Sequence, residues 1–243
     1  MSKGVRGGSA PRDTLDGDDG PENMVALRKV NRVFEMGSRE VHALKDVNMT
    51  LPAGRLATIQ GPSGSGKTTL LNLIGAMDVP SSGSVMVADQ ELGRLTDEAL
   101  TDFRRRNVGF VFQFFNLIPS LNAVENVLVP VMFEAEPPLD RAVELLGKVG
   151  LKDRWDHRPA QLSGGERQRL AVARALINDP AMVLADEPTG NLDHQTGEGI
   201  LNLFTDLVRE GRTVILVTHD VEVASKGEIV YMLRDGVMSE QKE

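Results

Sequence analysis

A glycine- and serine-rich stretch from Gly61 to Leu71, GPSGSGKTTLL, is the clearest candidate for chemistry in this sequence. Its start matches G-x-x-x-x-G-K-[ST], in which glycines let successive backbone N–H groups surround a phosphate. A helix that begins at Lys67 would add its positive dipole end, and the lysine would reach the β- and γ-phosphates. The hydroxyl of Thr68 would bind Mg²⁺. The predicted nucleotide-binding residues are Gly61, Pro62, Ser63, Gly64, Ser65, Gly66, Lys67, Thr68 and Thr69.

Two further polar clusters each follow an apolar run. Asp186 and Glu187 end the run that begins at Met182, and His219 ends the run that begins at Thr213. Ligands of open parallel sheets bind at the carboxyl ends of the strands, so these side chains should meet the glycine-rich loop there. Asp186 would then hold Mg²⁺, and Glu187 would take a proton from an attacking water or orient it. His219 would contact the γ-phosphate. The alternatives are a strand-ending turn for the two carboxylates and a structural role for the histidine.

The elements that must position these residues are apolar strands and amphipathic helices. Leu70, Leu73, Ile74 and Met77 recur at helical spacing, so a helix is predicted from Lys67 onward. Strands are predicted at residues 25–36, 42–51, 55–60, 107–113, 181–188 and 213–220, and further helices at 96–106, 139–151, 164–179 and 200–211. The near-continuous apolar runs of the last two strands are typical of a parallel sheet that is buried on both faces. The order of elements predicts an α/β fold with a helical subdomain at about residues 90–165.

Composition limits the remaining possibilities. Of the 243 residues, 41% are hydrophobic and 26% are charged, as in ordinary globular proteins. A net charge of −8 argues against a general nucleic-acid-binding protein, and the absence of cysteine excludes disulfides and thiolate metal sites. No run approaches the roughly 18 apolar residues of a membrane span, so a link to a membrane is expected through a partner and not by insertion. Residues 1–22 are rich in Gly, Asp and Pro and are expected to form a disordered tail before a domain at 23–241.

A second candidate anion site begins at Leu162. A serine hydroxyl and free N–H groups at a helix N-terminus can hold an anion, although an ordinary serine N-cap is the alternative. The residues of this stretch are Leu162, Ser163, Gly164, Gly165 and Glu166. Together with the glycine-rich loop and the segment ADEPTGNLD at 185–193, the stretch resembles the LSGGQ signature of ABC ATPases, with Glu in the last place. The resemblance extends over nearly the whole chain, from about Val25 to Met238.

The resemblance implies a fold, a nucleotide and several roles that the residues alone do not. The fold would be a P-loop NTPase with a RecA-like parallel-sheet core, an antiparallel β subdomain and an α-helical subdomain. ATP would be the nucleotide, with Mg²⁺ held by Thr68, Gln113 and Asp186, and Gln113 would also touch the attacking water. Asp193 would communicate between subunits. The ring of Phe34 would stack on adenine where the family usually has Tyr, although a core aromatic is the alternative for this residue.

The resemblance also implies partners. Two chains would form a head-to-tail homodimer on ATP binding, with each ATP between the P-loop of one chain and residues 162–166 of the other. A second helix N-terminus that faces the γ-phosphate would stabilise charge and exclude water. Hydrolysis would weaken the dimer, so the nucleotide would act as a two-state clamp. The dimer would drive separate integral membrane permease subunits, which would place the chain in the cytoplasm, peripheral on the inner face of the cell membrane.

A narrower resemblance concerns the branch of the family. The segments VGFVFQFFNLIPSLNAVENVLVP and ADEPTGNLD are similar to the LolD/MacB-like branch, whose members power lipoprotein release and the export of macrolides or antimicrobial peptides. An exporter or lipoprotein-release ATPase is therefore expected. The alternative is an FtsE-like regulatory ATPase, which would drive a membrane partner without moving a solute.

Four of the eight phenylalanines lie between residues 110 and 115. Phe110 and Phe112 alternate on a predicted strand, so we expect their rings in the core. The residues that follow are predicted to form a loop, and exposed apolar clusters often mark partner sites. This loop is the predicted groove for a short helix of the membrane subunit, formed by Phe114, Phe115, Leu117 and Ile118.

Overall fold

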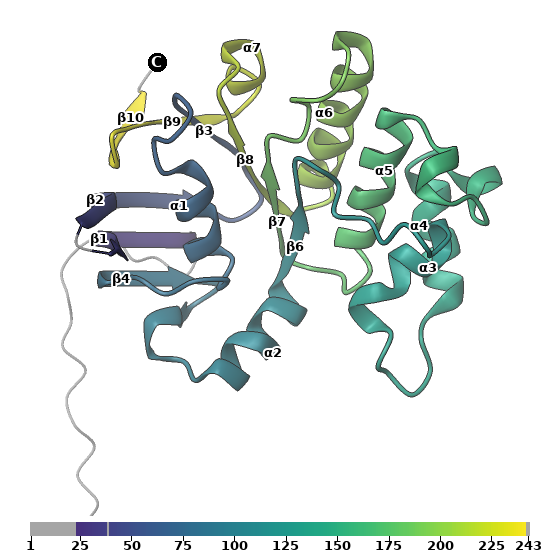
Figure 1. Ribbon diagram of the computed structural model, residues 1–243, viewed down its shortest axis with the longest axis horizontal. Helices are drawn as coiled ribbons and strands as arrows, with labels where there is room; N and C mark the ends of the chain where they lie inside the picture. The colour runs from purple at the N-terminus through teal and green to yellow at the C-terminus, as the bar shows by residue number, and fades with distance from the viewer. Residues whose placement is uncertain (1–22, 38, 242–243) are drawn as a thin grey trace, which may run out of the picture.

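The computed structural model describes residues 23–37 and 39–241, so the predicted tail at 1–22 and Ser38 lie outside the described residues. Its strands are β1 (Asn23–Met36), β2 (Arg39–Pro52), β3 (Leu56–Gln60), β4 (Ser82–Val87), β5 (Gln90–Glu91), β6 (Val108–Val111), β7 (Met182–Asp186), β8 (Thr213–Thr218), β9 (Ile229–Arg234) and β10 (Val237–Gln241). They form two sheets, one of six strands in the order β10-β9-β3-β8-β7-β6 and one of four in the order β2-β1-β4-β5 (Figure 1).

The six-stranded sheet is the parallel core that the sequence predicts. Strands β9, β3, β8, β7 and β6 run parallel, and β10 pairs antiparallel with β9. Alternate residues of β7 enter different cores: Met182 and Leu184 pack on one face, and Val183 and Ala185 on the other. Both faces are therefore covered, which explains the continuous apolar run of this strand. The predicted α/β class is confirmed.

The helices are α1 (Lys67–Ile74), α2 (Asp97–Asn107), α3 (Ala123–Leu128), α4 (Leu139–Lys148), α5 (Gly164–Ala175), α6 (His194–Arg209) and α7 (Val221–Ala224). Short 3₁₀ turns span Leu92–Arg94, Val129–Val131, Lys152–Arg154 and Pro159–Gln161. Helix α1 lies between the two sheets, because its Leu70 and Ile74 share a core with Leu27 of β1 and Ile59 of β3 (Figure 1). Within the described part of the chain, no helix is both long and apolar enough to cross a bilayer.

Helix α1 is shorter than predicted. It ends at Ile74, and Ala76 adopts a left-handed conformation with φ of 56°. The chain therefore leaves the helix before Met77, whose side chain is 53% exposed instead of buried on the helix face. The predicted position of Met77 on the helix face was wrong because the helix ends at its C-cap Gly75. Gly75 packs closely on Phe110, since a Cβ at this residue would lie only 2.0 Å from the Phe110 ring.

The region of the predicted helical subdomain contacts two different cores. Leu92, Leu100 and Phe103 pack into the core beneath the antiparallel sheet. Helices α3, α4 and α5 pack into the core on the other face of the parallel sheet, together with α6. Strand β6 lies between these two groups and ends at Val111, so the predicted strand position of Phe112 was wrong. The Phe112 ring instead stacks on Phe110, with 5.5 Å between the ring centroids.

Candidate nucleotide-binding site

The carboxyl ends of three central strands meet at one edge of the sheet. Gln60 of β3 pairs with Thr218 of β8, and Asp186 of β7 pairs with Val217 of β8. The N–H of Gly61 donates to Thr218 O at 3.3 Å, and the N–H of Glu187 donates to Val217 O at 3.0 Å. The glycine-rich loop, the carboxylate pair and His219 therefore all start at the same edge, as the apolar runs predict.

The glycine-rich loop leads into a helix start that is open to an anion. Gly66 is the N-cap of α1 and has φ of 103°, a conformation that residues with a Cβ rarely adopt. No side chain caps this helix and no acidic residue lies in its first turn. Its first N–H groups and its positive dipole end are thus available to a phosphate.

Lys67 lies beneath the loop. Its side chain is 6% exposed, and Nζ donates to Gly61 O at 2.9 Å and to Pro62 O at 3.0 Å. Nζ also lies 3.9 Å from Glu187 Oε1. The ammonium group is therefore satisfied by carbonyl oxygens of the loop itself, and it already occupies the position from which a lysine can bind a phosphate of a nucleotide.

Thr68 and Asp186 form a pair of oxygen ligands at the same place. Thr68 Oγ1 donates to Asp186 Oδ2 at 3.0 Å. Burial raises the pKa of Asp186 above its ordinary value, and the nearby Glu187 charge raises it further, whereas the Thr68 hydrogen bond lowers it. A hydroxyl and a carboxylate are hard oxygen donors, which suit Mg²⁺ when phosphate oxygens and water complete the shell. The two residues therefore fit the predicted metal.

Replacing Asp186 by Asn should change how stability depends on pH. The raised pKa means that the folded protein binds the Asp186 proton more tightly than the unfolded chain does. The free energy of unfolding of the wild type should thus fall as pH rises from the pKa of the unfolded chain, about 3.9, through the higher pKa of the folded protein. Asp186→Asn should remove this fall. Denaturant unfolding without nucleotide, repeated from about pH 3.5 to about pH 7 in steps of roughly half a unit, measures the free energy of unfolding at each pH.

Asp193→Asn is the matched control for that experiment. Hydrogen bonds from Thr196 lower the pKa of Asp193, so its linkage has the opposite sign. Relative to wild type, Asp193→Asn should lose stability as pH rises from the folded pKa to the unfolded pKa, and the deficit should stay constant above the unfolded pKa. Parallel pH curves for the two variants would contradict the expected burial of charge at Asp186.

Glu187 and His219 form a close side-chain contact beside the site. Glu187 Oε2 lies 2.8 Å from His219 Nδ1, and the glutamate carboxylate is largely buried whereas the histidine is exposed. Glu187 has φ of 44°, so the backbone turns sharply at the end of β7. The second ring nitrogen of His219 can face a ligand while Nδ1 holds the carboxylate.

Most of these residues line a cavity of about 490 Å³, and His219, which contacts Glu187, is not among the lining residues. Its lining includes Lys67, Thr68, Gln113, Asp186 and Glu187 and the loop residues Ser63, Gly64, Gly66 and Thr69. It also includes residues that sequence analysis missed, which are Val41, His42, Ala43 and Lys45 of β2 and the Asp235–Gly236 turn. No local pattern marks these residues, because they reach the loop only through sheet pairing and the closing hairpin.

Two predicted site residues differ in their relation to this cavity. Gln113 lines it, and Gln113 O accepts a hydrogen bond from Asn191 Nδ2 at 3.1 Å. Phe34 pairs with the lining residue Val41 across β1 and β2, but its own ring is not in the lining described here. Instead the guanidinium carbon of Arg32 lies 4.5 Å from the Phe34 ring centroid.

The signature stretch lies apart from the cavity of its own chain. Among the described residues, none of 162–166 lines that cavity. Ser163 caps α5: Ser163 Oγ accepts from Glu166 N at 3.2 Å, and Glu166 Oε2 accepts from Ser163 N at 2.8 Å. A Cβ at Gly165 would lie 2.3 Å from Thr196 Cγ2 of α6, so close packing of α5 on α6 requires this glycine.

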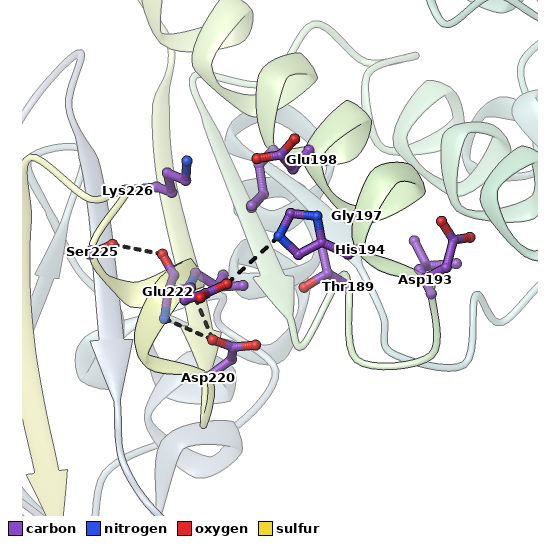
Figure 2. Close-up of a pocket in the computed structure, with 12 residues that line it drawn as sticks. Thr189, Asp193, His194, Gly197, Glu198, Asp220, Glu222, Ser225 and Lys226 are labelled. Carbon is purple, nitrogen blue, oxygen red and sulfur yellow. Dashed lines mark hydrogen bonds and ion pairs between the residues drawn. The ribbon is translucent and has the colours of Figure 1, made fainter.

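Asp193 caps the start of α6, where its carboxylate accepts from Thr196 N at 3.0 Å and Thr196 Oγ1 at 2.6 Å. It lines a second cavity of about 430 Å³ between α6 and α7 (Figure 2). His194 Nε2 lies 3.7 Å from Glu222 Oε2 in this cavity. The structure therefore places Asp193 outside the nucleotide cavity of its own chain.

Comparison with known proteins agrees with this geometry. A family model described as ABC transporter matches residues 44–190. The lipoprotein-releasing system ATP-binding protein LolD of Idiomarina loihiensis is 43% identical over 223 residues, which cover 90% of this chain and 98% of that protein. The macrolide export ATP-binding/permease protein MacB of Aggregatibacter actinomycetemcomitans is 42% identical over 217 residues, which cover 88% of this chain and 34% of that protein.

A solved structure shows a similar fold. It is the dimeric post-hydrolysis state of the ATP-binding cassette MJ0796, from Methanocaldococcus jannaschii, bound to ADP and phosphate. It superposes with a TM-score of 0.84 at 45% identity and covers 90% of this chain and 98% of that chain. The likeness therefore extends over both sheets and the helices around them.

Proposed function

The chain belongs to the ABC transporter family of ATP-binding proteins, and from this membership we propose that it hydrolyses ATP to drive a separate membrane permease. One observation carries the proposal. Lys67 and Thr68 begin α1, Asp186 ends β7 and Glu187 follows it, and these two separate segments line a single cavity at the end of the parallel sheet. A cation, two oxygen ligands for Mg²⁺ and a carboxylate base are the set that nucleoside triphosphate hydrolysis requires.

In this proposal the loop and Lys67 bind the phosphates. The exposed peptide groups of residues 62–64 and the first N–H groups of α1 surround the anion. Lys67 Nζ exchanges its bonds with Gly61 O and Pro62 O for phosphate oxygens. Mg²⁺, held by Thr68 and Asp186 with Gln113 beside them, would neutralise phosphate charge.

We assign to Glu187 the role of the base that accepts a proton from the attacking water. Its carboxylate is largely buried and faces Lys67 on one side and His219 on the other. The contact with His219 holds the carboxylate in place while the ring presents its other nitrogen to the γ-phosphate. His219 is thus a positioning residue for Glu187 and a candidate contact for the phosphate.

We also propose that the active species is a head-to-tail homodimer. The start of α5 at Ser163 does not contribute to the nucleotide cavity of its own chain, and the similar cassette MJ0796 forms a dimer. A second chain would bring residues 162–166 over the γ-phosphate and Asp193 to the subunit boundary. Phosphate release from MgATP per chain should therefore rise with protein concentration. Light scattering would show whether the chain is a monomer in dilute solution. Full ATP turnover by such a monomer would contradict the dimer.

The proposed partner is the permease of an exporter or a lipoprotein-release system. LolD and MacB, which resemble this chain over 88–90% of its length, are named for lipoprotein release and macrolide export. The structure modifies the predicted docking groove. Phe114 is 72% exposed and Ile118 is also exposed, whereas Leu117 packs on the helical core and Phe115 lies beneath the guanidinium of Arg167.

Phe114→Ser should therefore weaken capture of the permease from detergent-solubilised membranes by at least about tenfold, as for a buried aromatic anchor. Basal ATP hydrolysis should stay at the wild-type level, because Phe114 does not line the cavity. Met77→Ser, at another exposed apolar residue, just beyond the end of α1, is the control and should leave capture unchanged. Wild-type capture by Phe114→Ser would contradict the proposed groove.

A further inference from the structure

The turn between β9 and β10 is bonded to the phosphate loop. The turn has two residues, Asp235 with φ of 51° and Gly236 with φ of 80°, and such a left-handed pair favours the sequence Asp-Gly. The Gly236 N–H donates to Ser65 O at 3.1 Å, and the Lys45 N–H donates to Gly236 O at 2.8 Å. Main-chain hydrogen bonds thus join the phosphate loop, the hairpin turn and β2 in series.

Close backbone packing accompanies these hydrogen bonds. A Cβ on Gly61 would lie 2.1 Å from Leu233 O, and a Cβ on Gly66 would lie 2.4 Å from Ala43 O. A Cβ on Gly236 would lie 2.9 Å from the same Ala43 oxygen. The first glycine of the loop is therefore pressed against β9 and the last against β2, with no side chain between them.

The loop needs such support to bind an anion. Glycine and serine residues restrict the backbone weakly, and residues 62–64 are exposed and belong to no helix or strand. A ligand that must order its own binding loop loses affinity by the cost of that ordering. Asp235 and Gly236 also line the nucleotide cavity, together with Lys45. The hairpin thus contacts the loop at the place where phosphate would bind.

We propose that the Asp235–Gly236 turn is a positioning element of the phosphate loop. It holds the loop against β2, so that the backbone N–H groups stay converged on the phosphates and nucleotide affinity depends on the C-terminal hairpin. The inference rests on the proposed function in one respect, namely that the ligand of the cavity is ATP.

A pair of substitutions at Asp235 tests this inference. Valine is strained at φ of 51°, whereas asparagine tolerates it. Both remove the carboxylate charge from the cavity, so the difference between them reports the turn alone. The Kd for MgATP, measured by calorimetry, should be about tenfold or more higher for Asp235→Val than for Asp235→Asn, since a smaller fraction of loops would be competent. The KM for ATP should rise in parallel while kcat at saturating ATP is retained.

The turn between β4 and β5 provides a matched control. It also has two residues, Ala88 and Asp89, with φ of 46° and 59°, and it does not line the nucleotide cavity. Asp89→Val and Asp89→Asn carry the same strain difference and should bind MgATP equally well. If Asp235→Val does not fold in a thermal scan, Asp235→Ala takes its place against the same asparagine variant.

The outcomes separate this inference from the proposed function. Equal ATP affinities for the valine and asparagine variants at Asp235, with normal binding by wild type, would overturn the hairpin inference alone. An equal loss of affinity in Asp89→Val would also overturn it, because the effect would then be general strain. A wild-type chain that binds no MgATP would overturn both proposals together.

Discussion

Glu187→Gln should lower ATP turnover by about 10²–10⁴ while MgATP binding is retained. The amide has nearly the shape of the carboxylate, so it can keep the contact to His219 and the position near Lys67. It cannot take a proton from water, and this loss alone should stop the chemical step. The variant should therefore accumulate as an ATP-bound dimer that wild type forms only transiently.

Three measurements on the Glu187→Gln chain test this expectation. Phosphate release gives turnover, calorimetry gives ATP affinity, and light scattering with and without MgATP gives the mass of the species. Glu210→Gln removes a charge at the distal end of α6, where Glu210 pairs with Lys148, and should behave as wild type. Wild-type turnover by Glu187→Gln would remove Glu187 from the role of base.

Lys67→Ala should act earlier, on nucleotide binding itself. Hydrogen bonds to a charged group contribute roughly 1.5–3 kcal/mol, so the loss of the ammonium should weaken MgATP binding by about 10- to 150-fold. The buried side chain is bonded to Gly61 O and Pro62 O, so the empty loop also loses an internal support. In Lys67→Ala both ATP turnover and ATP affinity should fall, whereas in Glu187→Gln only turnover should fall. Lys148→Ala, which removes an ammonium far from the cavity, should leave ATP affinity unchanged.

The Lys67→Ala chain also tests whether each site is shared. A second variant, Ser163→Phe, should block the signature stretch and leave the P-loop of its own chain intact. Each variant alone should be inactive, but a mixed dimer contains one complete site, built from the P-loop of the Ser163→Phe chain and the signature of the Lys67→Ala chain. Mixing the two inactive proteins should restore part of the wild-type turnover. No recovery, with both proteins folded and present in mixed dimers, would contradict sites shared between chains.

Several features of the fold were predictable because their signals are local. The continuous apolar runs of β7 and β8 predict buried parallel strands, and the polar residues that follow them predict the edge at which ligands bind. A helix was predicted from residue 96, and Thr96 caps α2, where its side chain accepts a hydrogen bond from Ala99 N at 3.3 Å. Predictions failed at the ends of elements: α1 ends at its C-cap Gly75 and Ala76 is left-handed, so Met77 leaves the helix face, and Phe112 lies beyond the end of β6.

By itself, the sequence determined the glycine-rich loop and the apolar strands that carry the carboxylates, and it predicted which residues bind phosphate and metal, because glycine spacing, charge and apolar runs act within a few residues. Only the tertiary structure decided what surrounds them. The Thr68–Asp186 hydrogen bond, the Glu187–His219 pair and the hairpin turn against the phosphate loop each join segments that are far apart in the chain. Such contacts depend on the register of neighbouring strands and on close backbone packing, and neither is written in any local pattern.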